Sequence, residues 1–245
     1  MTNLRDLART SPILRKLKPR VWELFRPDLT PAQSLTKLTL GMKAPTLLDV
    51  GANIGQFGID VRNSGYSGRI VSFEPVSSLF VKLNKTSHKY LPWETLNKAL
   101  GSHVHKAHIN VSNNSGLSSS LLEISQTHLD TFPNSFTNSR EEVEISTLDI
   151  EVERLNLNLS ETVLKVDVQG FESNVIQGGQ NSIPQISFIL LELSLTPLYE
   201  SEETFLNGLN KLHDLGHEII DIHRGIQNRS GALLQVDVIT KSIRS

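Results

Sequence analysis

The sequence predicts an α/β fold in which a mostly parallel sheet carries helices on both faces. From residue 46 onward, short runs of aliphatic and β-branched residues recur, and several are apolar almost throughout, as is typical of strands covered on both sides. Helical patterns separate the early runs, and such alternation indicates parallel pairing through right-handed crossovers. The last two runs are joined by turn-forming residues, so we expect them to form an antiparallel hairpin at the sheet edge.

Seven strands are predicted, with helices between several of them. The strands are expected at 46–50, 69–75, 93–100, 162–168, 187–193, 217–222 and 233–240. Helices are expected at about 31–42, 55–64, 76–89 and 172–180, and residues 13–25 are expected to form one or two short helices interrupted at Pro19. A polar, turn-rich segment at about 101–146 interrupts this rhythm, and we interpret it as an insertion that contains a hairpin or an irregular excursion. Substrate contacts are expected there, because loops carry function while the sheet supplies rigidity.

The composition suits one large globular domain and excludes several kinds of site. Of the 245 residues, 38% are hydrophobic and 20% are charged. Because cysteine is absent, disulfides, thiolate metal ligands and a cysteine nucleophile are excluded. The start of the chain lacks the apolar core of a signal peptide, and the longest apolar runs are too short to cross a bilayer. These features predict a cytoplasmic protein.

Residues 1–44 are predicted to form a basic helical extension, and residues 45–245 the main domain. Residues 1–43 contain nine Lys or Arg and three Asp or Glu, a net charge of +6, so the remainder carries −8. The arm either packs on the main domain as a solvated extension or contacts a membrane surface or a lipid-linked or phosphorylated substrate. It could also mediate a homodimer. The acidic overall balance argues against nucleic acid as the partner.

A glycine-rich loop follows the first strand of the predicted sheet. Gly51 and Gly55 let backbone come close to a ligand at the carboxyl end of this strand, where α/β sheets bind ligands. In a dinucleotide fingerprint, glycine would stand at the position of Asn53. This difference disfavours a nicotinamide-dependent oxidoreductase. It suits a ligand without phosphates that carries a carboxylate and an ammonium group.

An acid ends the second predicted strand. Glu74 lies 19 residues after Gly55, where a carboxylate can accept hydrogen bonds from both hydroxyls of a ribose. The following Pro75 ends the strand. The alternative is that Glu74 caps the next helix. Loop and acid together favour an adenosine ligand.

Five motifs in series resemble the FkbM family of S-adenosylmethionine-dependent methyltransferases. They are LLDVGANIGQF, FEP, NKALG, LKVDVQGFE and ILLEL, within a region of roughly 45–240. The resemblance implies a Rossmann-like class I methyltransferase fold, with a seven-stranded, mostly parallel sheet whose last strand is antiparallel. S-adenosylmethionine is the cofactor that it implies. The basic arm lies outside the resemblance.

The resemblance also implies which residues surround the cofactor. Asp49, Gly51, Asn53 and Gly55, with the adjacent Gln56, are expected at the methionine end. Glu74 and Pro75 are expected at the ribose, Asn97 and Ala99 near the adenine, and Asp167 near the methyl group. Ser119 and Ser120 belong to a Ser-Leu element of this family and are expected to approach the cofactor or the acceptor.

Lys165 and Asp167 lie two residues apart on a predicted strand and therefore share one face. Charges on a buried strand need a reason, because unpaired charges there are costly. Either the two neutralise each other, or Asp167 acts as a base or acceptor clamp that Lys165 keeps ionised. Glu192 is the second candidate base. We interpret Glu172 as a cap that supports the loop.

The leading functional prediction is O-methyl transfer to a hydroxyl of a sugar, glycan or secondary metabolite. The alternatives are N-methylation of a small molecule and a non-catalytic module that binds the cofactor or a partner. No metal site is predicted, although Asp167 and Glu192 could share a divalent ion if they converge. His103, His105 and His108 fit exposed strand histidines better than metal ligands.

Overall fold

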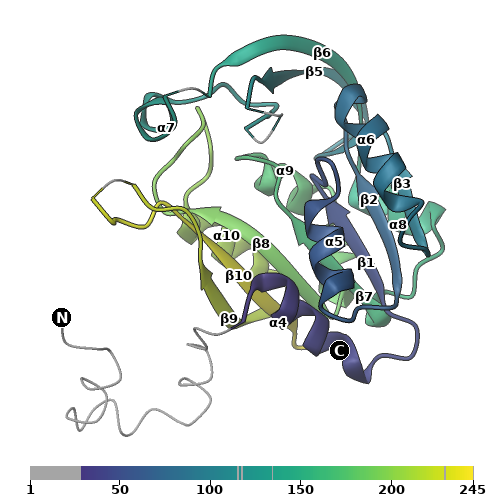
Figure 1. Ribbon diagram of the computed structural model, residues 1–245. Helices are drawn as coiled ribbons and strands as arrows, with labels where there is room; N and C mark the ends of the chain where they lie inside the picture. The colour runs from purple at the N-terminus through teal and green to yellow at the C-terminus, as the bar shows by residue number, and fades with distance from the viewer. Residues whose placement is uncertain (1–28, 115, 117, 134, 229, 245) are drawn as a thin grey trace, which may run out of the picture.

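Figure 1 shows the computed structural model of the chain, which describes residues 29–244 except 115, 117, 134 and 229. Most of the basic arm, including the helical segment expected at 13–25, lies outside the described residues. None of the helices within them is long and apolar enough to cross a membrane.

The main sheet has the predicted class I arrangement. Its strand order is β3-β2-β1-β7-β8-β10-β9, in which β10 pairs antiparallel with β8 and β9 while the other neighbours pair parallel. The predicted antiparallel last strand and the terminal hairpin are therefore confirmed. The strands are β1 (Thr46–Val50), β2 (Arg69–Phe73), β3 (Trp93–Leu96), β7 (Thr162–Val166), β8 (Phe188–Ser194), β9 (His217–Arg224) and β10 (Gln235–Ser242).

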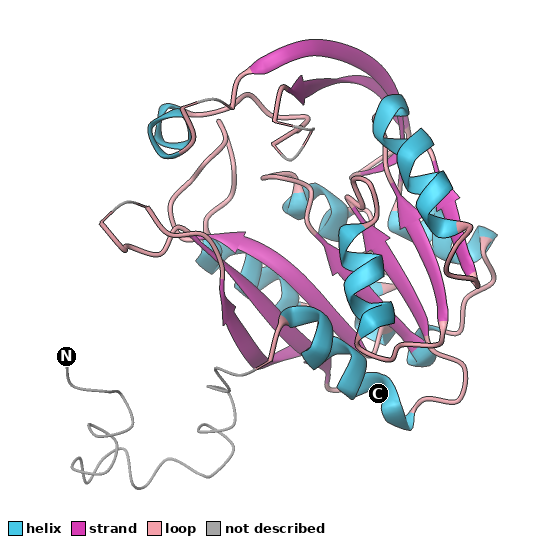
Figure 2. Ribbon diagram, in the orientation of Figure 1, coloured by secondary structure: helices cyan, strands magenta, loops and turns pink. Residues whose placement is uncertain are grey.

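Helices cover both faces of this sheet, as predicted (Figure 2). On one face lie α4 (Pro31–Leu38), α5 (Gln56–Asn63) and α6 (Ser77–Ser87). On the other lie α8 (Leu148–Arg154), α9 (Glu172–Gln177) and α10 (Phe205–Asp214). Successive residues of one strand point to opposite faces and are buried in different cores, as Leu47 and Leu48 of β1 are. Burial on both faces explains why these strands are apolar almost throughout. Short 3₁₀ turns occur at Thr39–Gly41, Leu159–Glu161 and Ile183–Gln185.

The insertion forms a second, three-stranded sheet of order β4-β6-β5 beside the main one. It comprises β4 (Ala99–Leu100), β5 (His105–Ser112) and β6 (Thr137–Ser146), with the short helix α7 (Gln126–Thr131) between β5 and β6. The long antiparallel pair β5 and β6 curves away from the main sheet in Figure 1. β5 lies in the segment where a hairpin or an irregular excursion was expected, but its partner β6 follows only after α7, so the pair is not a simple hairpin. The single strand expected at 93–100 is instead two strands, β3 and β4, which belong to different sheets.

The start of α4 belongs to the same packed body as the sheet. Pro31 occupies the first turn, as predicted, and Thr30 forms a capping box with Gln33. Ala32 and Leu35 are buried in the core between α4, α5 and the sheet. This packing brings the first turn of α4 to the edge of the sheet where the functional residues gather.

Candidate active site

A cavity of about 680 Å³ opens where the parallel strands end. Residues after β1, β2 and β7 line it, together with side chains of β8 and β10. The first turn of α4, the helix α5, residues 98–100 and residues 119–121 of the insertion also contribute to the lining. Both the position and the volume are typical of small-molecule sites in α/β proteins.

The loop between β1 and α5 is held by its own hydrogen bonds. The N–H groups of Gly51 and Ala52 both donate to the carbonyl of Phe73, at 3.1 and 3.0 Å. Asn53 has a φ of +51°, which asparagine tolerates better than most residues, and its Oδ1 accepts the N–H of Ile54 at 2.8 Å. The loop therefore has a defined path beside the cavity.

Glycine is required at position 51 both by the turn itself and by the residue that follows the neighbouring strand β7. Gly51 has a φ of +78°, and a Cβ at this position would lie 1.8 Å from the carbonyl oxygen of Asp167.

We expect Gly51→Ala to lower the free energy of unfolding by about 3–5 kcal/mol, as measured by urea denaturation. Gly65→Ala is the matched control, because Gly65 has a φ of +98° but nothing within 4 Å of its added Cβ. It should cost only about 1–2 kcal/mol. Equal losses in the two variants would contradict this explanation.

Glu74 is buried directly after β2 and accepts two backbone hydrogen bonds. The N–H groups of Val76 and Asn53 donate to its two carboxylate oxygens, each at 2.8 Å. Burial raises the pKa of Glu74 to about 7, although both hydrogen bonds oppose this shift. The bond to Val76, the N-cap of α6, matches the capping alternative. Glu74 also lines the cavity and retains acceptor capacity, so its contact with a ribose stays a prediction.

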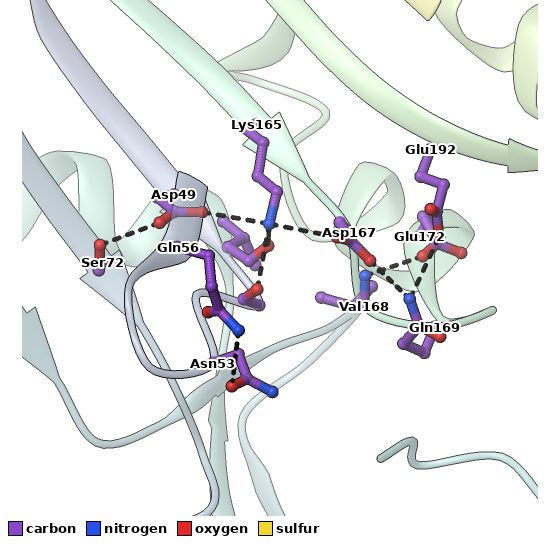
Figure 3. Close-up of polar contacts among 12 residues, drawn as sticks. Asp49, Asn53, Gln56, Ser72, Lys165, Asp167, Val168, Gln169, Glu172 and Glu192 are labelled. Atoms are coloured by element: carbon purple, nitrogen blue, oxygen red, sulfur yellow. Dashed lines mark hydrogen bonds and ion pairs between the residues drawn. The ribbon is translucent and has the colours of Figure 1, made fainter. Parts of the chain in front are cut away.

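Lys165 is a buried cation that joins the glycine loop to the end of β7 (Figure 3). Its Nζ lies 3.2 Å from Oδ1 of Asp49 and 3.5 Å from Oδ2 of Asp167, and it donates to the carbonyl of Gly51 at 3.0 Å. Burial alone would lower the pKa of Lys165, but the charges of Asp49 and Asp167 outweigh it and raise the pKa above its usual value. Asp49 is fully buried and also accepts the hydroxyl of Ser72 at 3.2 Å. Mutual neutralisation is therefore part of the role of Lys165.

The side-chain amide of Gln169 lies between the two candidate bases. Its Nε2 donates to Oδ1 of Asp167 at 2.7 Å and to Oε2 of Glu192 at 3.2 Å, as Figure 3 shows. Its Oε1 accepts the hydroxyl of Tyr199 at 2.7 Å. Asp167 and Glu192 thus converge on one amide group, and the side chain of Asp167 is 35% exposed. Among the described residues, no group of three or more His, Asp or Glu is arranged to hold a metal ion.

Glu172 shapes the loop that presents this amide. Its Oε1 accepts the N–H groups of Val168 at 2.9 Å and of Gly170 at 3.2 Å, which matches the supporting role expected for it. Burial raises the pKa of Glu172 to about 8. From the insertion, the hydroxyl of Ser120 donates to the carbonyl of Gln169 at 2.6 Å. The loop after β7 is therefore fixed from two sides.

Asp237 is a further acid of the cavity that the sequence analysis missed. It lies on β10 directly opposite Glu192 on β8. Burial, with the charge of Asp167, raises the pKa of Asp237 to about 6. Burial and the charges of Asp167 and Asp237 raise the pKa of Glu192 well above its usual value. The available signal was an acid within the otherwise apolar run LLQVDVIT, the same kind of signal that identified Lys165 and Asp167.

Most of the predicted site residues line the cavity. They are Gly51, Asn53, Gln56, Glu74, Pro75, Ala99, Ser119, Ser120, Lys165, Asp167 and Glu192. Asp49 and Gly55 are outside this lining, and Asn97 is exposed. The amide of Asn97 donates to the carbonyls of Glu74 and Pro75, at 2.9 Å each, and so holds the chain where β3 and β4 separate. Its place near the adenine stays a prediction.

The predicted histidine cluster lies apart from this cavity lining. His103 and His108 are exposed and His105 is partly buried, in keeping with their interpretation as surface histidines. The rings of His103 and His105 stack with their centroids 4.1 Å apart.

The sequence matches the family model of the methyltransferase FkbM domain over residues 49–219. The chain belongs to the FkbM methyltransferase family. The family match confirms the resemblance inferred from the five motifs, and the chain is an S-adenosylmethionine-dependent methyltransferase. A comparison with curated proteins found no match.

The chain is similar to several solved methyltransferase structures, at low identity and with TM-scores below 0.5. Fibrillarin from Aeropyrum pernix, with natively bound S-adenosylmethionine, is 12% identical with a TM-score of 0.47, and the match covers 90% of this chain and 74% of that one. The 1,6-didemethyltoxoflavin-N1-methyltransferase from Burkholderia thailandensis is 9% identical with a TM-score of 0.46 and coverages of 86% and 76%. Magnesium protoporphyrin IX methyltransferase from Synechocystis is 9% identical with a TM-score of 0.45 and coverages of 86% and 77%. Identities this low say nothing about the acceptor of this FkbM protein.

The cavity fits the cofactor of the family. Gly51 lines the cavity without a side chain, and Asn53 and Gln56 add polar groups to the same wall. Glu74 can accept hydrogen bonds from a ribose at the next strand end. These residues would hold S-adenosylmethionine.

Proposed function

We propose that this FkbM protein transfers the methyl group of S-adenosylmethionine to a hydroxyl of a sugar, glycan or secondary metabolite. Asp167 is the proposed general base. The observation that supports this best is the position of its carboxylate, which lines the cavity at the end of β7 beside the glycine loop. Lys165, at 3.5 Å, balances its charge.

A hydroxyl needs a base because it is a weak nucleophile at neutral pH. As the acceptor oxygen takes the methyl group, its proton passes to a carboxylate oxygen of Asp167. S-adenosylmethionine supplies the methyl group when bound and leaves as S-adenosylhomocysteine. The buried ion pair of Lys165 with Asp49 fixes the strand end, so that Asp167 keeps its orientation toward the acceptor.

The charge of the lining supports a neutral or cationic acceptor. The described acids of the lining are Asp60, Glu74, Asp167, Glu192 and Asp237, against Lys98 and Lys165. Lys98 is paired with Glu151 at 3.0 Å and Lys165 with Asp49, so neither is free for an anion. A phosphorylated group would be repelled at this end. The same lining favours N-methylation of a small amine as the second candidate, because a cationic acceptor would be attracted.

Calorimetry and an acceptor panel test this proposal. We expect the protein to bind S-adenosylmethionine but not NAD, since Asn53 stands where the dinucleotide loop has glycine. The panel contains neutral sugars and oligosaccharides, hydroxylated metabolites, small amines and sugar phosphates, and release of S-adenosylhomocysteine is measured. We expect release with neutral hydroxyl acceptors. Release with amines alone would transfer the assignment to N-methylation, and binding without release from any class would favour a non-catalytic module.

A further inference from the structure

The side-chain amide of Gln169 lies between the carboxyl groups of Asp167 and Glu192, and the backbone of Gln169 has an unusual conformation. Gln169 is not glycine, yet it has a φ of +57°, a conformation that costs free energy for a residue with a side chain. The backbone N–H groups of Val168 and Gly170 donate to Glu172, and the hydroxyl of Ser120 donates to the carbonyl of Gln169. These three hydrogen bonds maintain the conformation. The surrounding structure therefore holds the side chain of Gln169 in one place, between Asp167 and Glu192.

The neighbours of this amide determine its orientation. An amide has one end that donates and one that accepts, and the oxygens of an ionised carboxylate only accept. Nε2 must therefore face Asp167, at 2.7 Å, and the same nitrogen reaches Glu192 at 3.2 Å. The buried hydroxyl of Tyr199 then donates to Oε1 at 2.7 Å. Each donor in this series of hydrogen bonds therefore faces an acceptor.

We propose that Gln169 is a positioning residue that holds the carboxyl groups of Asp167 and Glu192 together and favours the ionised form of Glu192, with Tyr199 fixing the orientation of its amide. Two carboxylates brought together repel each other and favour sharing a proton. Two N–H donors from one amide offset that repulsion, because hydrogen bonds to ionised groups are stronger than neutral ones. The catalytic consequence rests on the proposed function, whereas the positioning itself does not.

Other titratable groups face the same pair and set the background against which Gln169 acts. They are Lys165 on β7, Asp237 on β10, Glu172 on α9, and Tyr199. The ring of His128 packs against the ring of Tyr199, with the two ring centroids 5.2 Å apart. Lys165 favours the ionised form of Glu192, while Asp237 and Glu172 oppose it. All of these groups remain when Gln169 alone is replaced, although the hydroxyl of Tyr199 loses its acceptor Oε1.

The test is the pH dependence of the unfolding equilibrium of the whole chain, measured in urea from pH 5 to pH 9 for Gln169→Met. The pKa of Glu192 in the folded protein is already raised, so its contribution to stability falls as pH rises through that value. In Gln169→Met, among the described residues only the amide of Gln235 still donates to Oε2 of Glu192, at 2.9 Å, so this pKa rises further and the fall extends to higher pH. We expect the unfolding constant of the variant, relative to the wild type, to increase about tenfold from the acid to the alkaline end.

Gln126→Met is the matched control. Gln126 also donates its amide to a carboxylate, Asp130 at 2.8 Å, but on the exposed surface of α7. Its unfolding constant should follow the wild type at every pH, because exposed contacts of this kind contribute little. Tyr199→Phe removes only the group that orients the amide, and we expect the same direction of change as for Gln169→Met with a smaller size.

A loss of stability in Gln169→Met that is equal at every pH would overturn the proposal, because it would mean that Gln169 only fills space. These measurements require no acceptor, so they hold even if the proposed reaction is wrong. With an acceptor from the panel, Gln169→Met should lower kcat and move the acid limb of the rate profile to higher pH, with KM unchanged. A raised KM with unchanged kcat would assign Gln169 to acceptor binding instead.

Discussion

Asp167→Asn is expected to reduce methyl transfer by about 10²–10⁴-fold while the protein still binds S-adenosylmethionine. Asparagine keeps the shape of the side chain but cannot take the proton of the acceptor. Asp167 lies after β7, with its backbone N–H donating to the carbonyl of Val50 at 3.1 Å, so the strand end should keep its path. Turnover is measured as release of S-adenosylhomocysteine with an acceptor from the panel, and binding by calorimetry.

Two further variants make this result specific. Asp214→Asn changes an exposed carboxylate at the end of α10, outside the cavity lining, and should leave turnover unchanged. Glu192→Gln tests the second candidate base. If Glu192→Gln abolishes turnover while Asp167→Asn retains it, Glu192 and not Asp167 is the base.

Lys165→Met is expected to lower the free energy of unfolding by about 3–5 kcal/mol, because it leaves a buried carboxylate without its counter-ion. Asp49 is fully buried and Lys165 is 5% exposed, so water cannot replace the lost ammonium group. Methionine has a similar length and no charge, so the substitution mainly removes the ion pair and the hydrogen bond to the carbonyl of Gly51. Urea denaturation at neutral pH measures the loss.

Lys106→Met is the surface counterpart of this variant. Lys106 pairs with Glu142 at 2.8 Å, but both side chains are more than half exposed. Its loss should leave the urea midpoint nearly unchanged, because exposed ion pairs contribute little. Adding Asp49→Asn to Lys165→Met should recover part of the stability, because the uncompensated charge is then gone. A double variant no more stable than Lys165→Met would show that the ion pair is not the cause.

The arrangement of the main sheet was predictable because each of its signals is local. The strands are recognisable as continuous apolar runs such as TLLDV and FILLEL, and burial on both faces requires such runs. Gly51, Asn53, Glu74 and Asp167 could be placed because residues at the carboxyl ends of parallel strands meet at one edge. The division of 93–100 into β3 and β4 was not predictable, because it depends on the hydrogen bonds of Asn97 to a distant strand end.

The acceptor side of the site could be predicted only in part. Asp167 and Glu192 were identified as charges in buried strands, but the amide that joins them was not, because glutamine in a loop carries no distinctive pattern. Tyr199 follows β8 in the chain and reaches Gln169 only because the two loops fold against each other. Asp237 faces Glu192 because β10 inserts antiparallel between β8 and β9.

By itself, the sequence determined the fold class, the family and the wall of the cavity formed by the loop after β1. These features follow from residue types at fixed spacing, since strand ends and tight turns depend on a few neighbouring residues. Only the tertiary structure decided which charges are compensated and which face the cavity. Compensation depends on distances between groups on different strands, such as Lys165 with Asp49 and Gln169 with Glu192, and spacing along one chain does not contain those distances.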